Sequence, residues 1–255
     1  MSPEPPNALA HWSPDEASDD LAAAIWRSVV RETLAPPRHF TSWLLSKPAK
    51  QVGGDFHLTT DSWIVVGDVS GKGVPAALLT GMFVAALKLA LRLPDPIKAL
   101  EHALYDELER AQAFTTLAAV ELGADGWLNY FNLGHPPALV RRSTGQVESL
   151  GAGAPPVGTF KLDTYPVQTV RLRPGDLLCL YTDGLIEAER NSGSGSEWFG
   201  SDRLAACLAR HAQLADAAQG LLSELGSWQL TDDLTVLMLQ YQPERGWTDE
   251  RLSRR

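Results

Sequence analysis

The chain has 255 residues, 44% of them hydrophobic and 21% charged, which is an ordinary composition for a soluble globular protein able to bury a substantial core. Its formal net charge of −9 argues against nucleic acid as a partner, and its two cysteines cannot form a disulfide framework. No signal peptide and no apolar run of ~18 residues is found, so we expect a cytoplasmic protein that does not bind membranes.

The N-terminal region predicts a tail followed by one helix. Residues 1–18 are rich in Pro, Ser and acids, which is typical of a loosely ordered segment. Residues 19–34 can form a helix that is capped by Asp19 or Asp20 and stopped by Pro36, with Leu21 and Ile25 on one apolar face. This helix either packs on its own domain or joins two subunits in a homodimer.

The first half of the remaining chain predicts strands, then helices, then strands again. We expect strands at 41–46, 52–58 and 62–68, and a long helix from Val74 that is apolar on nearly every side and therefore deeply buried. A second helix, 95–110, has Asp95 as its cap. A hairpin of 115–122 and 127–133, a strand at 138–142, a turn at 143–146 and a loop at 151–158 follow.

The second half predicts two further paired strands, two helices and a last strand. Strands 165–172 and 177–182 flank a type II turn at 173–176, because Pro and then Gly occupy its central positions. The Gly/Ser tract 191–196 is either a surface loop or a flap that faces substrate. Helices 202–211 and 216–225 precede strand 234–241 and a solvated tail. Hairpins with helices inserted in pairs indicate an α+β fold with antiparallel sheets.

Acidic residues stand where several predicted strands end or begin. Asp68 ends an apolar strand and is followed closely by glycines, so its carboxylate is held at a rim beside backbone that a ligand can approach. Asp55, Asp183 and Asp232 have comparable positions. We expect these four acids to converge if their strands are neighbours in one sheet. Converging carboxylates repel each other and commonly hold divalent cations.

Five segments carry a family resemblance. They are, in chain order, residues 52–56 (VGGDF), 67–79 (GDVSGKGVPAALL), 132–139 (NLGHPPAL), 181–185 (YTDGL) and 232–236 (DDLTV). Together they resemble the motifs of the SpoIIE/RsbU-type branch of the metal-dependent protein phosphatases (PPM), which are related to protein phosphatase 2C. The resemblance covers roughly residues 36–241.

This resemblance implies a fold and a division of the chain. The family fold is a sandwich of two antiparallel β-sheets flanked by helices (αββα). We expect the phosphatase domain at 36–242, an N-terminal tail and helix at 1–35, and a C-terminal tail at 243–255.

The resemblance also implies a site with two Mn²⁺ or Mg²⁺ ions. Asp68 would bridge both ions, the backbone carbonyl of Val69 would be a further ligand, and Asp183 and Asp232 would hold the first ion. Asp55 would bind the second ion, directly or through water. Such an ion pair activates water for in-line attack on phosphorus, so all four acids are predicted to be catalytic as well as metal-binding.

The implied activity is that of a serine/threonine phosphatase. From the resemblance alone, its substrate would be a phosphorylated anti-anti-sigma (STAS) regulator in bacterial partner switching. The alternative is a non-catalytic module that keeps the fold and binds a phosphoprotein; loss of an acidic ligand would favour it, and none is lost.

The roles of three residues and the general acid stay open. Asp233 could be a ligand, a partner of the ligands or a cap, and Lys72 could bind phosphate or simply be an exposed loop residue. His135 could be structural or a general acid. Ser70 stands where eukaryotic relatives have a histidine, so that general acid cannot be transferred.

Two other nucleotide-related motifs fail. Residues 67–73 do not match a P-loop. A P-loop has four residues between its two glycines and a Ser or Thr after its lysine, whereas here three residues separate Gly67 from Gly71, and Gly73 follows Lys72. Residues 53–56 lack the second acid of the diguanylate cyclase signature.

Overall fold

The computed structural model describes residues 24, 26, 36–151, 153–192 and 195–243. Of the helix predicted at 19–34, only Ala24 and Trp26 are described, and both are helical. The rest of that helix and most of both predicted tails lie outside the described residues. No described helix is long and apolar enough to cross a membrane.

Two five-stranded antiparallel sheets form the centre of the fold. The first contains, in spatial order, β2 (Asp55–Thr59), β3 (Trp63–Val69), β4 (Thr115–Leu122), β5 (Trp127–Leu133) and β8 (Gln168–Arg171). The second contains, again in spatial order, β1 (Phe40–Lys47), β12 (Leu234–Tyr241), β9 (Leu177–Tyr181), β6 (Ala138–Arg141) and β7 (Val147–Leu150).

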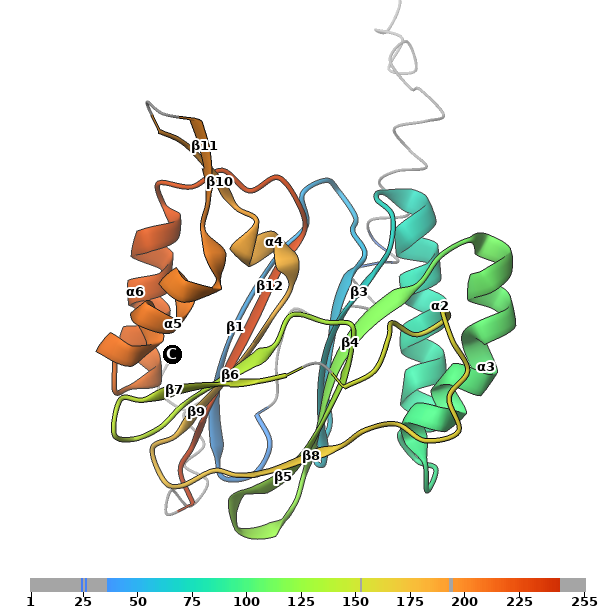
Figure 1. The fold of residues 1–255 in the computed structure, drawn as a ribbon, viewed down its shortest axis with the longest axis horizontal. Coiled ribbons are helices and arrows are strands. Elements are labelled where there is room, and N and C mark those ends of the chain that lie inside the picture. Colours follow the sequence, from blue (N-terminus) through green and yellow to red (C-terminus); the bar gives the residue numbers. More distant parts are fainter. Residues whose placement is uncertain (1–23, 25, 27–35, 152, 193–194, 244–255) are drawn as a thin grey trace, which may run out of the picture.

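A pair of helices covers the outer face of each sheet (Figure 1). Helices α2 (Val74–Ala90) and α3 (Pro96–Ala111) pack on the first sheet, and α5 (Gly200–Arg210) and α6 (Leu214–Leu225) pack on the second. Strand β9 shows how the sequence supports both layers: Leu178 and Leu180 lie in the core between the sheets, whereas Cys179 and Tyr181 lie in the core under α5 and α6. This period-two alternation of buried faces confirms the predicted αββα sandwich.

The strand predictions are largely confirmed, with four main differences. The strand expected at 52–58 begins only at Asp55. The strand expected at 165–172 is paired only from Gln168, because Pro166 has no N–H to contribute to a ladder. A short strand, β7, was not predicted. The described residues of the Gly/Ser tract belong to a hairpin of β10 (Glu189–Ser192) and β11 (Gly195–Trp198), so of the two alternatives the plain surface loop was wrong, and a flap that faces substrate stays a prediction.

The prediction that the helix from Val74 is buried on all sides was also wrong. Leu78 and Leu89 of α2 are 69% and 66% exposed. They lie three helical turns apart on one face, whereas Phe83, Val84 and Leu87 face the first sheet and α3. The apolar composition of α2 therefore exceeds what its packing requires.

Candidate metal centre

The four predicted acids come from the facing ends of both sheets. Asp55 is the first residue of β2 and lies directly opposite Asp68 of β3 in the antiparallel register. Asp183 follows β9 as the first residue of the short helix α4 (Asp183–Ile186), and Asp232 stands just before β12, the neighbour of β9. The expectation that neighbouring strands of one sheet would collect all four was therefore wrong, because each sheet contributes one pair.

A threonine between the sheets fixes Asp55. The hydroxyl of Thr182 donates to Oδ2 of Asp55 over 2.8 Å, and Thr182 in turn accepts a hydrogen bond from the amide of Thr235. Asp55 is only 3% exposed and Thr182 is fully buried. These bonds tie the second sheet to the first at the site. Thr182 was not predicted as a site residue, although it stands inside the matching segment 181–185.

Asp233 positions the loop before Asp55. Its two carboxylate oxygens accept hydrogen bonds from the amides of Ala49 (2.7 Å) and Gly54 (2.8 Å). A side chain on Gly53 would collide with this carboxylate, since a Cβ there would lie 2.0 Å from Oδ2. Of the open alternatives for Asp233, the structure favours a partner that holds the ligand-bearing loop in place.

Glycine at position 54 lets two potential ligands approach the same point. A Cβ on Gly54 would lie 2.3 Å from the carbonyl oxygen of Val69 and 2.6 Å from Oδ1 of Asp68. The amide of Val69 donates to the carbonyl of Gly54, so the two segments are held at this close approach. The carbonyl of Val69 and the carboxylate of Asp68, which the resemblance assigns to the metal site, are thus adjacent.

Burial and mutual repulsion disfavour the ionised form of these carboxylates. Burial raises the pKa of Asp55 to about 7, against hydrogen bonds from Thr182 and Thr235 that lower it. Burial also raises the pKa of Asp68 to about 9, and the charges of Asp55 and Asp183 add to the increase. The pKa of Asp183 is raised by its burial and by Asp232. Bringing these acids together therefore calls for positive charge between them.

Part of that positive charge comes from Lys72. Its ammonium group lies 2.7 Å from Oδ2 of Asp232, while its side chain is 54% exposed. Lys72 is therefore an exposed loop residue, as one of the two alternatives predicted, and it pairs with Asp232; phosphate binding stays a prediction.

The predicted residues suit a hard divalent cation by their chemistry. They offer carboxylate oxygens and one backbone carbonyl, the donors that Mg²⁺ and Mn²⁺ prefer. Within the described residues, however, no three Asp, Glu, His or Cys side chains are already arranged to hold an ion. In this arrangement Oδ2 of Asp55 accepts a hydrogen bond from Thr182, and Oδ2 of Asp232 pairs with Lys72. Binding of a cation by Oδ2 of Asp232 would require that oxygen to leave Lys72.

His135 is structural in this arrangement. It is 3% exposed, its Nδ1 lies 2.9 Å from the hydroxyl of Thr116, and its amide donates to the side chain of Asn132. Burial lowers the pKa of His135 to about 3, with the backbone of Tyr181 acting in the opposite direction. A neutral, enclosed imidazole is poorly suited to act as a general acid near neutral pH.

Comparison with known proteins places this architecture in a family. The family model described as "Stage II sporulation protein E (SpoIIE)" matches residues 59–242. The SiaA-PP2C domain of Pseudomonas aeruginosa superposes with a TM-score of 0.77 at 26% identity, covering 92% of this chain and all of that domain.

Two curated proteins are also similar to this chain in sequence. Protein IcfG of Synechocystis is 27% identical over 75% of this chain, but the chain spans only 36% of IcfG. Phosphoserine phosphatase RsbU of Bacillus subtilis is 24% identical over 87% of this chain and 69% of its own length. Because the family model matches well over half of the chain, the protein belongs to the SpoIIE family, the SpoIIE/RsbU-type branch of the PPM phosphatases.

Proposed function

We propose that this chain is a divalent-metal-dependent protein phosphatase that hydrolyses phosphoserine or phosphothreonine. The observation that carries the proposal is that Asp55, Asp68, Asp183 and Asp232 come from two sheets to the same end of the sandwich, close enough for their charges to interact at the electrostatic cost described above. A fold does not collect buried like charges without compensation elsewhere. Bound Mn²⁺ or Mg²⁺ would supply that compensation.

Each residue has a distinct part in this proposal. Asp68 would bridge the two ions and the Val69 carbonyl would be a further ligand. Asp183 and Asp232 would hold the first ion, and Asp55 would bind the second, directly or through water. Two such ions would lower the pKa of water and neutralise phosphoryl oxygens, which is the chemistry that phosphomonoester hydrolysis needs.

The surrounding residues orient the ligands and attract the substrate. Thr182 holds Asp55 through its hydroxyl, and Asp233 fixes the Gly54 backbone that precedes it. Lys72 lies at the exposed side of the site, where its ammonium group can meet a phosphate dianion once Asp232 is engaged elsewhere.

We further propose a phosphorylated STAS-domain regulator as the substrate. The support is family membership together with the likeness to RsbU, which is named a phosphoserine phosphatase. The β10–β11 hairpin rises beside α4, which begins with Asp183, so it is placed to contact a protein substrate (Figure 1).

The test compares hydrolysis of an aryl phosphate and of a phosphoserine STAS protein, each with and without Mn²⁺. We expect Mn²⁺-dependent release of phosphate from both, with Asp68→Asn reducing turnover by about a hundredfold or more. Asp61→Asn, which changes an exposed acid in the β2–β3 turn, is the matched control and should retain full activity.

Two results would count against the proposal. Activity that survives chelation and the Asp68→Asn change would contradict the metal mechanism. Folded protein that binds the phosphorylated STAS protein in the presence of Mn²⁺ but releases no phosphate would instead support the non-catalytic binding module.

A further inference from the structure

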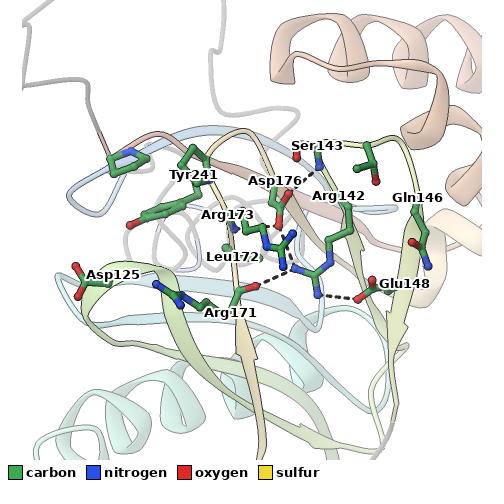
Figure 2. A pocket seen from close by; sticks show the side chains of 13 residues that line it. Asp125, Arg142, Ser143, Gln146, Glu148, Arg171, Leu172, Arg173, Asp176 and Tyr241 are labelled. Carbon is green, nitrogen blue, oxygen red and sulfur yellow. Dashed lines mark hydrogen bonds and ion pairs between the residues drawn. The ribbon is translucent and has the colours of Figure 1, made fainter.

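A pocket lies at the end of the sandwich opposite the carboxylates. It has a volume of about 790 Å³ and is lined by the turns that follow β6 and β8 and by the end of β12 (Figure 2). Strand β12 begins beside Asp232 and ends at Tyr241, which lines the pocket. At ~3.3 Å per residue, this strand separates the two sites by roughly 23 Å. The pocket is therefore independent of the candidate metal centre.

A buried carboxylate builds one wall of this pocket. Asp176 has no exposed surface and accepts hydrogen bonds from the amides of Ser143 (2.7 Å) and Arg173 (3.0 Å) and from Nη1 of Arg142 (3.0 Å). Glu148 accepts a bond from Nη2 of Arg142, and the carbonyl of Arg171 accepts one from Nη1. The guanidinium of Arg142 is thus fixed, and its Nε–H and second Nη2 hydrogen have no acceptor among the described residues, so they can donate to a ligand.

The other guanidinium groups of the pocket are not neutralised in this way. Arg173 projects toward Arg142, and Asp125 lies at the edge farthest from Arg142 (Figure 2). Arg171 lies over the ring of Trp127 at 5.4 Å. Among the described residues, no carboxylate forms an ion pair with Arg171 or Arg173. The lining as a whole is charge-balanced, with three arginines and three acids, but the guanidinium groups of Arg171 and Arg173 are exposed and open to an anion.

We propose that this pocket binds a small organic phosphate of about mononucleotide size. Guanidinium groups match phosphate geometry, so Arg173 and the available edge of Arg142 would hold the phosphate. Ser143 and Gln146 offer neutral hydrogen-bonding groups for a sugar or base, and Tyr241 adds an aromatic wall. The volume is far larger than a phosphate ion needs and lies within the usual range for small-molecule sites.

The proposal is tested by calorimetric titration of the full chain in EDTA with AMP, ribose 5-phosphate and inorganic phosphate. EDTA removes divalent cations, so the carboxylate end of the molecule repels the probes. We expect saturable binding of AMP that Arg173→Gln weakens by about tenfold. Arg110→Gln removes an exposed arginine of α3 and should leave the affinity unchanged. Thermal unfolding of both variants checks that neither change acts through the fold.

Three results would overturn the proposed phosphate site. Absence of saturable AMP binding up to about 5 mM would overturn the proposal, as would equal affinity in wild type and Arg173→Gln. Inorganic phosphate binding as tightly as AMP would overturn the assignment of an organic ligand. None of these results depends on whether the chain hydrolyses phosphoproteins.

Discussion

At the residue scale, the candidate site depends on close backbone approach as much as on its acids. Gly54 is the point at which the segment before β2 meets the Asp68–Val69 segment, and Asp233 holds it there. The sequence indicated this glycine only as part of a motif. Its physical reason, the room needed by the Val69 carbonyl and the Asp68 carboxylate, depends on contacts between distant segments.

Gly54→Ala should damage both stability and the site. The new Cβ would overlap the Val69 carbonyl, so we expect a loss of about 1–3 kcal/mol in the free energy of unfolding and a large loss of Mn²⁺ affinity. Gly81→Ala is the control, since a Cβ there meets nothing within 4 Å in helix α2 and should stabilise by about 0.5–1 kcal/mol. Urea unfolding measures both; equal behaviour of the two variants would contradict the packing argument.

Lys72→Gln should strengthen Mn²⁺ binding while weakening phosphate binding. The ammonium group competes with cations for Asp232, but the pair is largely exposed, so the gain in Mn²⁺ affinity should be modest, about two- to fivefold. Inhibition of hydrolysis by inorganic phosphate should become weaker in the same variant. Lys88→Gln, on the exposed side of α2, is a suitable control. Unchanged Mn²⁺ affinity would show that the ion pair does not compete with the metal.

At the element scale, alternation and turn chemistry predicted most strands, because each central strand faces two apolar layers. Strand 234–241 was placed at its observed limits. The failures share a cause: β10, β11 and β7 are short, half-exposed strands whose pairing depends on neighbours rather than on their own pattern. The acids were identified correctly as strand-end residues, but single-strand patterns could not show that they come from two sheets.

The β5–β6 connection should make stability depend on pH through His135. Its pKa is about 3 when folded and ~6.5 when unfolded, so between these values the unfolded state binds the extra proton. The contribution of His135 to the free energy of unfolding should therefore fall by up to about 1.4 kcal/mol per unit as pH drops from ~6.5 toward 3, whereas Asp55 and Asp68, whose pKa values are raised, act in the opposite direction. Its hydrogen-bonded network includes one other titratable group, Tyr130, which is neutral throughout this range because burial raises its pKa.

The measurement is urea unfolding between pH 4 and 8 for wild type, His135→Gln and His102→Gln. The histidine contribution should disappear in His135→Gln and persist in His102→Gln, which changes an exposed residue of α3. If all three proteins show parallel pH profiles, His135 is not the buried neutral group described above.

At the scale of the whole molecule, three parts of the fold meet at the site: the two sheets and the N-terminal region. Each sheet supplies two acids, and Trp26, from the N-terminal region, packs into the core beneath α2 and donates its indole N–H to the carbonyl of Gly53 over 2.9 Å. Sequence periodicity predicted a helix there but gave no sign that it reaches the glycine pair before Asp55. At Trp26, the structure supports packing on the same domain; dimerisation through residues 19–34 stays a prediction.

Trp26→Phe should therefore weaken Mn²⁺ binding at the metal centre. The change keeps an aromatic ring but leaves the Gly53 carbonyl without its donor, so we expect a loss of about 1–3 kcal/mol in stability and weaker Mn²⁺ binding. Trp198→Phe, at a 61% exposed position, should change neither quantity. If Trp26→Phe leaves stability and Mn²⁺ affinity unchanged, Trp26 does not support the metal centre.

The most direct test of the central claim is calorimetric titration of Mn²⁺ into the full chain and into Asp68→Asn. We predict two bound ions per wild-type chain, and a sharp loss of affinity in the variant because Asp68 would bridge both ions. Failure of the wild type to bind Mn²⁺ at millimolar concentration, or equal binding by Asp68→Asn, would contradict a metal centre formed by these acids.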